Sequence, residues 1–202
     1  MKMLSLVLIG LLVAAAVSVG AATSDAALKG EPDGPRFTAD GELMKPENYR
    51  QWVAIGTGLN MSYGPAGDSM NGEPPFTNVF VNPAAYRSFL QTGMWPDRTV
   101  FILEIRESIA VNNSRNGGNG YFQGDVIGIE AEVKDASRFP EKWAFFGLSP
   151  SGRSGAQIPA AASCYSCHAK NAAVENTFVQ FYPVLRDVAR DKGTYKVVPE
   201  VF

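Results

Sequence analysis

Two cysteines and one histidine are the only residues of their types in this chain of 202 residues, and all three fall in one run of five residues. The run reads Cys164-Tyr165-Ser166-Cys167-His168, which is the spacing at which proteins attach c-type haem. In that chemistry the two thiols add across the vinyl groups of the porphyrin, and the adjacent imidazole binds the iron. We therefore expect one covalent haem c, held by Cys164 and Cys167, with His168 as the proximal iron ligand.

Three other interpretations of the run explain less. A thioredoxin-like redox pair needs a βαβ context near the N-terminus, but this pair is late in the chain and follows alanine and serine residues. A structural zinc site needs four ligands, and the chain has only three Cys or His side chains in total. A plain disulfide would make the adjacent histidine a coincidence.

The sixth position on the iron decides what such a haem could do. A single histidine excludes ligation by two imidazoles and leaves a methionine, a lysine, water, a gas or no ligand. A methionine in that position would suit an electron carrier, with Met61 or Met70 from a long loop as the first choices and Met44 or Met94 as the next. Methionines in loops are more often gap-fillers.

The N-terminus has the pattern of a secretory signal peptide. Lys2 precedes an apolar run over residues 4–19, and the small residues 20–22 follow it. The apolar run is short for a membrane span, so we expect cleavage and no stable membrane anchor. Because c-type haem is attached on the outer side of the bacterial inner membrane, the two patterns together predict a periplasmic protein.

Length and charge give the expected domain organisation. Residues 1–22 are the signal peptide, residues 23–36 a flexible leader rich in small residues, and residues 37–202 one haem domain. Cleavage would remove one of the 18 basic residues and leave the 20 acidic ones, for a net charge near -3. A charge this mild argues against nucleic acid as a partner.

Residue periodicity predicts a mainly antiparallel β domain of the α+β class. Apolar residues alternate or cluster as in strands over residues 51–57, 79–81, 99–107, 127–133 and 143–148. The third and fourth of these are expected to form a hairpin, because the glycine-rich residues 117–120 lie between them. Residues 58–75 are rich in Gly, Pro and Asn and are expected to form a long loop.

A few short helices complete the expected fold. One should begin at Pro83, after Asn82 as its N-cap, and end at Gly93. A second carries the haem motif near the C-terminus. A third follows Pro183 and ends before Gly193.

Seven segments of the chain resemble the cytochrome P-460 family, which includes the cytochromes c′-beta. They are residues 47–52 (ENYRQW), 118–125 (GNGYFQGD), 133–135 (VKD), 138–140 (RFP), 143–145 (WAF), the haem motif, and 181–186 (FYPVLR). The resemblance implies a periplasmic, largely antiparallel-β protein, commonly homodimeric, with one c-type haem.

The resemblance also implies one of two activities. Cytochromes P-460 proper oxidise hydroxylamine at a haem cross-linked to a lysine, whereas the c′-beta members bind nitric oxide or carbon monoxide in an apolar distal pocket. Leu103 aligns with the cross-linking lysine, and no lysine occurs between Lys45 and Lys134. The family's enzymes also carry a distal carboxylate upstream of the haem motif, and residues 143–163 contain no Asp or Glu.

These departures favour a gas-binding cytochrome. An apolar wall made by Leu103 with Phe76 or Phe80 would favour a small neutral diatomic ligand such as nitric oxide or carbon monoxide. The alternatives are an electron carrier, which would need a redox partner such as another cytochrome, and a hydroxylamine oxidoreductase, for which the expected base is missing.

Overall fold

The computed structural model describes residues 33–61, 73–111 and 119–198. Its main element is a five-stranded antiparallel sheet in the order β2-β3-β4-β5-β6, beside a two-stranded sheet of β1 and β7. The strands are β1 Leu43–Met44, β2 Val53–Leu59, β3 Phe76–Val81, β4 Val100–Val111, β5 Gly120–Lys134, β6 Trp143–Leu148 and β7 Ser154–Gly155. The helices are α2 Pro83–Thr92, α3 Ser163–Asn171 and α4 Pro183–Asp191, with single 3-10 turns η1 Tyr49–Gln51 and η2 Val179–Phe181. The predicted fold class is confirmed.

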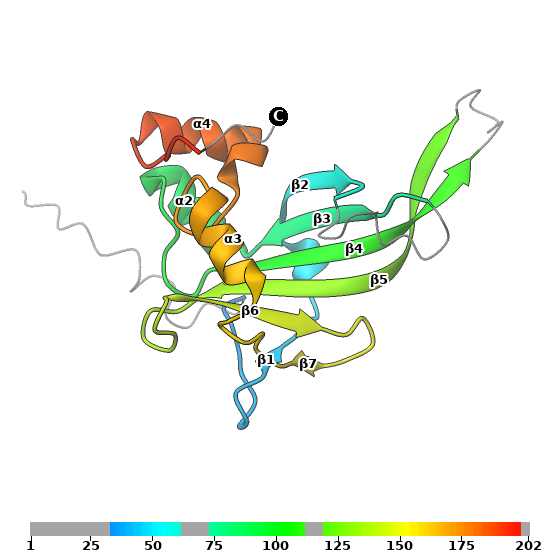
Figure 1. Ribbon diagram of the computed structural model, residues 1–202, viewed down its shortest axis with the longest axis horizontal. Coiled ribbons are helices and arrows are strands. Elements are labelled where there is room, and N and C mark those ends of the chain that lie inside the picture. The colour runs from blue at the N-terminus through cyan, green and yellow to red at the C-terminus, as the bar shows by residue number, and fades with distance from the viewer. Residues whose placement is uncertain (1–32, 62–72, 112–118, 199–202) are drawn as a thin grey trace, which may run out of the picture.

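The five-stranded sheet buries apolar side chains on both faces, because successive residues of a strand point to opposite sides. On one face, Ile102 and Phe146 pack in a core that also contains Leu43 of β1. On the other, Phe101 packs in a core that contains Phe89 of α2 and Leu185 of α4. We call this second side the helical face. Figure 1 shows α2, α3 and α4 gathered over one end of the sheet.

Helix α2 begins and ends where the sequence predicts. Pro83 occupies its first turn, and Gly93 follows it with φ 71°, the left-handed conformation that glycine adopts at helix ends. The side chain of Asn82 does not cap the helix. Its amide oxygen instead accepts a hydrogen bond of 2.9 Å from the backbone N–H of Val100, so Asn82 joins the helix to the start of β4.

The predicted hairpin is formed by β4 and β5, which run antiparallel and extend well beyond the rest of the sheet (Figure 1). Half of the glycine-rich connection, residues 117 and 118, lies outside the described residues, which resume at Asn119. The strand expected over residues 51–57 begins later, at Val53, because residues 49–51 form a 3-10 turn.

Residues before the expected start of the domain at residue 37 already contact the folded domain. Asp33 accepts a hydrogen bond of 2.7 Å from the side chain of Asn48, and residues 34 and 35 are buried. Residues 33–36 of the expected leader therefore pack against the domain, while the expected signal peptide lies outside the described residues. Within the described ranges, no helix is both long and apolar enough to cross a membrane.

Candidate haem site

Helix α3 carries the two cysteines and the histidine near the C-terminus, as predicted. Cys164, Cys167 and His168 stand at positions i, i+3 and i+4, so the three side chains share one side of the helix. Both thiols are free, and that of Cys167 is exposed. The thiol of Cys164 is partly exposed, and both thiols are close in sequence to the imidazole, as covalent haem attachment requires.

Tyr165, inside the haem motif, attaches α3 to strand β6. Its hydroxyl donates a hydrogen bond of 3.0 Å to the carbonyl of Ile158 and accepts one of 3.3 Å from the backbone N–H of Phe145. The two rings also meet edge to face, with their centroids 4.8 Å apart. The start of α3 is thus held against the sheet by a residue of the motif itself.

The ring of His168 is held in one orientation. Its Nδ1 lies 2.7 Å from the backbone carbonyl oxygen of Asn176. Because a carbonyl can only accept, Nδ1 must carry the proton, and the lone pair of Nε2 is left for a metal. Phe145 and Phe178 contact the ring edge to face, at centroid distances of 4.6 and 4.5 Å. A neutral imidazole in this tautomer is the form that ligates iron.

Two carboxylates of β5 lie on the same face of the sheet as His168. Glu132 is buried, and its Oε1 lies 3.6 Å from Nδ1 of His168 and accepts no hydrogen bond from any described residue. Burial raises the pKa of Glu132, although the neighbouring imidazole opposes this. Glu130, one step along the same face, is partly buried, and burial raises its pKa too.

The carboxylates in turn affect the imidazole. Burial alone would lower the pKa of His168, but the Glu132 carboxylate and the Asn176 carbonyl outweigh it, and the pKa is raised. The sequence shows that Glu130 and Glu132 share a face, since they alternate with apolar residues. It does not show that helices cover that face, so their proximity to His168 was not predicted.

A row of small and half-buried residues crosses the sheet beside this histidine. Strand pairing aligns Val79, Leu103, Glu130 and Gly147 on the helical face, one step from the pair Glu132 and Phe145 that His168 contacts. Val79, Leu103 and Glu130 are only partly buried. A Cβ atom added at Gly147 would meet no described atom within 4 Å. We call these four residues the open row, because three of them are partly exposed and a side chain at the fourth would meet no described neighbour.

The structure brings Leu103, but neither predicted phenylalanine, to this face. Phe80 pairs with Ile102, and its ring contacts that of Tyr49 at 5.6 Å on the opposite side of the sheet. Phe76 pairs with Arg106 and has the same parity as Phe80. The expected wall of Leu103 with Phe76 or Phe80 is therefore not formed by these strands.

The candidate methionine ligands are scattered. Met44 lies in β1, Met61 follows β2, Met94 follows α2, and Met70 lies outside the described residues. The three described methionines are 38%, 57% and 38% exposed. In the described part of the chain, none of the hydrogen bonds, ion pairs or ring contacts of His168 involves a methionine.

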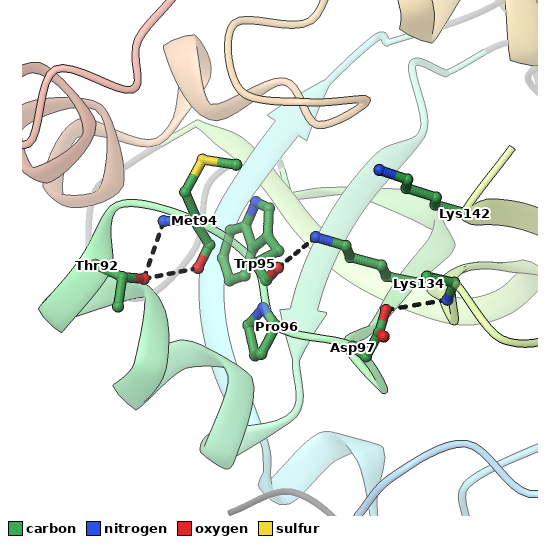
Figure 2. A pocket seen from close by; sticks show the side chains of 8 residues that line it. Thr92, Met94, Trp95, Pro96, Asp97, Lys134 and Lys142 are labelled. Carbon is green, nitrogen blue, oxygen red and sulfur yellow. Dashed lines mark hydrogen bonds between the residues drawn. The ribbon is translucent and has the colours of Figure 1, made fainter. Parts of the chain in front are cut away.

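A pocket of about 320 Å³ lies near Met94, between the end of α2 and strand β5 (Figure 2). Trp95, Asp97 and two lysines, Lys134 and Lys142, are among the eight residues that line it. Neither cysteine nor the histidine of the haem motif belongs to this lining. The pocket is thus separate from the haem motif. Two of its lining residues, Trp95 and Lys134, contact the turn that carries the Asn176 carbonyl.

The residues on and around α3 fit a covalently attached haem. Two thiols that are at least partly exposed could attach the group, the free Nε2 of the imidazole could bind its iron, and the partly exposed open row lies beside them. A search of curated proteins gave no match. A family model described as Cytochrome P460 matches residues 46–179, which is more than half of the chain and includes the haem motif and the open row. The chain therefore belongs to the cytochrome P460 family and is a haem c cytochrome of that family.

Proposed function

We propose that this cytochrome holds one haem c through Cys164 and Cys167, with Nε2 of His168 on the iron, and binds nitric oxide or carbon monoxide at the sixth position. The observation that carries the proposal is the state of the chain's one histidine. Its Nδ1 is committed to the Asn176 carbonyl, so its only free nitrogen serves the proximal side. A second imidazole does not exist in the sequence.

The open row supports a small neutral ligand over a covalent modification. Leu103 aligns with the cross-linking lysine of the family's enzymes, and a leucine has no nucleophile to offer a porphyrin. Val79 and Leu103 together present apolar surface next to the histidine. When bound, haem supplies an iron that coordinates a diatomic molecule. The side chains exclude larger or charged ligands by size and by the cost of desolvation.

The proposal includes a cellular setting. An exported chain with covalent haem would act in the periplasm, where nitric oxide arrives by diffusion. A homodimer, and a second cytochrome that reduces the iron, are the partners we infer from the family resemblance. We propose that the mature protein has no stable membrane anchor.

Haem attachment is tested first by denaturing electrophoresis with haem staining. We expect the wild type to retain the stain and the double variant Cys164→Ser/Cys167→Ser to lose it, because no thioether can form. Ser166→Ala is the matched control, since its hydroxyl donates a hydrogen bond to the Ser163 carbonyl of the same helix. A wild type without haem stain would contradict the proposal.

A second candidate function is oxidation of hydroxylamine, and one observation favours it. Glu130 stands directly across from Leu103 in the open row, so the described site does contain a carboxylate, supplied by β5 rather than by residues 143–163. Burial raises its pKa, which is the direction expected of a general base that works near neutral pH.

Steady-state assays separate the two functions. If the protein binds gas only, the haem-loaded wild type should oxidise hydroxylamine no faster than a free haem c peptide does. Rapid turnover by the wild type that falls by about 100-fold or more in Glu130→Gln would instead assign Glu130 as the base. Glu141→Gln, on the exposed turn before β6, is the control for a change of charge.

A further inference from the structure

The carbonyl that orients His168 belongs to a tight turn. Val174 and Thr177 exchange backbone hydrogen bonds across it, of 3.3 and 2.9 Å, with Glu175 and Asn176 between them. Glu175 has φ 50°, in the left-handed region that a residue with a side chain seldom adopts. A conformation of this kind persists only where the surroundings enforce it. The residues that enforce it therefore also control where the Asn176 carbonyl points.

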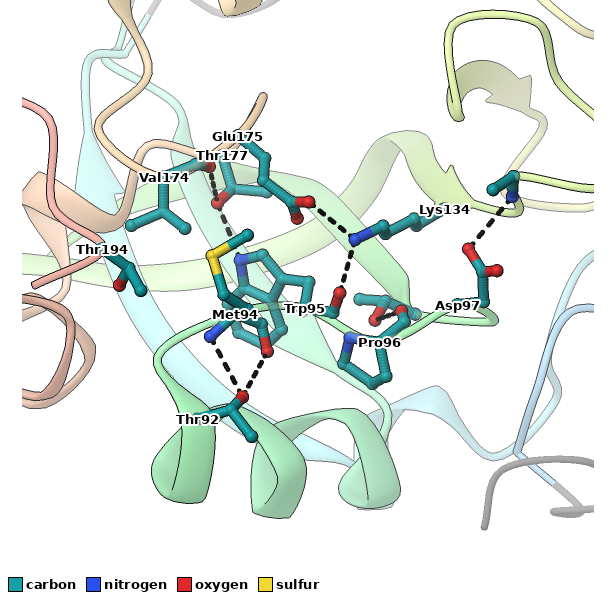
Figure 3. A network of polar contacts seen from close by, with 12 residues as sticks. Thr92, Met94, Trp95, Pro96, Asp97, Lys134, Val174, Glu175, Thr177 and Thr194 are labelled. Atoms are coloured by element: carbon teal, nitrogen blue, oxygen red, sulfur yellow. Dashed lines mark hydrogen bonds and ion pairs between the residues drawn. The ribbon is translucent and has the colours of Figure 1, made fainter. Parts of the chain in front are cut away.

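Both neighbours of Asn176 are tied to segments far away in the chain, the residues after α2 and the end of β5, as Figure 3 shows. The indole N–H of Trp95 donates a hydrogen bond of 2.8 Å to the hydroxyl of Thr177. Nζ of Lys134 donates one of 2.6 Å to the carboxylate of Glu175 and one of 2.5 Å to the backbone carbonyl of Trp95. We call Trp95, Lys134, Glu175 and Thr177 the proximal clamp.

The clamp is rigid because its parts are buried. Trp95 is 2% exposed and Thr177 3%, and the side chains of Lys134 and Glu175 are 11% and 19% exposed. The indole is also enclosed by the ring of Phe89, at a centroid distance of 4.1 Å, and by other core residues. Hydrogen bonds in such surroundings are not weakened by competing water. The turn is thus fixed relative to the sheet.

His168 has a second acceptor within reach. The carboxylate of Glu132 lies 3.6 Å from Nδ1, its Oε1 accepts no hydrogen bond among the described residues, and it is as buried as the ring itself. A carboxylate is a stronger acceptor than a carbonyl, and the resulting bond would give the imidazole more anionic character. The Asn176 carbonyl, at 2.7 Å, is closer to Nδ1 than the carboxylate is, and it holds the Nδ1 hydrogen bond in its place.

We propose that the proximal clamp selects the acceptor of the His168 Nδ1 proton, by holding the Asn176 carbonyl in place and so keeping the proton from Glu132. Trp95, Lys134, Glu175 and Thr177 are in this sense positioning residues for the iron ligand. They keep the imidazole from becoming strongly anionic, so that it donates only moderate electron density to the iron. Such a ligand suits reversible binding of a neutral gas. The inference rests on the proposed ligation of iron by His168.

The test compares two substitutions of Thr177 in the haem-loaded protein. Thr177→Val removes the hydroxyl at similar volume, whereas Thr177→Ser keeps it. The readout is the iron–histidine stretching frequency of the ferrous protein, measured by resonance Raman spectroscopy, which rises as the imidazole becomes more anionic. We expect a higher frequency in Thr177→Val, the wild-type value in Thr177→Ser, and a return to the wild-type value in the double variant Thr177→Val/Glu132→Gln.

A folded Thr177→Val with an unchanged or lower frequency would overturn the selection by the clamp, and so would a raised frequency that persists in the double variant. If Thr177→Val does not fold, the same measurement is made on Glu175→Gln, which weakens the contact with Lys134 at a partly exposed site and should also raise the frequency. Its matched control is Asp187→Asn, which removes the exposed ion pair with Arg186. A wild type without any iron–histidine stretch would instead overturn ligation by His168 and leave the clamp without a ligand to position.

Discussion

At the scale of single residues, the site depends on what each polar atom of α3 contacts. Nδ1 of His168 donates a hydrogen bond to the backbone carbonyl of Asn176, and Nε2 is left free to bind a metal. The hydroxyl of Tyr165 donates a hydrogen bond to Ile158, in the segment before α3, and accepts one from Phe145 of β6. The haem motif therefore contains both the ligand and the residue that fixes the helix carrying it.

Tyr165→Phe should loosen the helix without removing the ligand. The variant keeps the edge-to-face contact with Phe145 and loses the hydroxyl contacts, so we expect the free energy of unfolding to fall by about 1 kcal/mol. Urea unfolding of the haem-loaded protein measures this. Tyr195→Phe is the control, since its ring contact with Arg190 does not need the hydroxyl. Equal stability of the Tyr165→Phe variant and the wild type would show that the hydroxyl does not hold α3.

At the scale of elements, the site depends on strand register. Pairing places Leu103 and Glu130 side by side on the helical face and turns Phe76 and Phe80 to the opposite one. The second sheet depends on a close approach as well. A Cβ atom at Gly155 of β7 would lie 1.9 Å from the carbonyl oxygen of Gly147 in β6, so only glycine allows the two strands to meet.

Gly155→Ala should accordingly force β7 away from β6. We expect a loss of at least about 2 kcal/mol in the free energy of unfolding, because the clash is with backbone that cannot rotate away. The matched control is Gly120→Ala at the start of β5, where a Cβ would meet no described atom within 4 Å. Thermal unfolding followed by circular dichroism compares the two. Similar melting of both variants would contradict the close approach.

A buried carboxylate on the face opposite the helices adds a dependence on pH. Glu104 is 2% exposed and accepts hydrogen bonds from Tyr49, from Arg50 at 2.8 Å and from Arg106 at 2.5 Å. Burial alone would raise the pKa of Glu104, but the bonds from its three partners outweigh it, and the pKa is lowered. The stabilisation is therefore complete above the ordinary glutamate pKa and is lost as the pH falls through the lowered one.

Glu104→Gln tests this cluster. At neutral pH the free energy of unfolding of the variant should be about 3 kcal/mol lower than that of the wild type, because two arginines lose their anionic partner. The difference should narrow as the pH falls below about 4, because the carboxyl group of the unfolded chain takes up a proton there while that of the folded chain still resists it. Urea titrations across this pH range measure it, with Glu141→Gln as the exposed control. A difference that stays constant down to about pH 3 would contradict the lowered pKa.

How far the sequence predicted these elements follows from what periodicity can report. The five main strands, the three helices and the α3 location of the haem motif were predicted, because alternation, proline and glycine signals are local. The short strands β1 and β7 were not, since two residues carry no period. The expected wall of Leu103 with Phe76 or Phe80 does not form, because the sequence of one strand does not show its register with the next.

At the scale of the whole molecule, the candidate site joins segments that are far apart in the chain. His168 of α3 meets Glu132 of β5 and Asn176 of the following turn, and that turn is tied to Trp95, 82 residues upstream of Thr177. The haem motif could be predicted from the sequence, because its chemistry needs a fixed local spacing of the two cysteines and the histidine. The clamp and the two carboxylates were not, since each depends on tertiary contacts between distant segments.

The optical spectrum of the ferrous haem-loaded protein, before and after addition of carbon monoxide, tests the central claim most directly. With His168 as the only protein ligand, the iron should be five-coordinate and high-spin before addition and should bind carbon monoxide without first losing a ligand. A low-spin ferric protein with a near-infrared thioether band would contradict this by showing a methionine ligand. A strongly red-shifted ferrous Soret band would contradict it by showing a cross-linked haem.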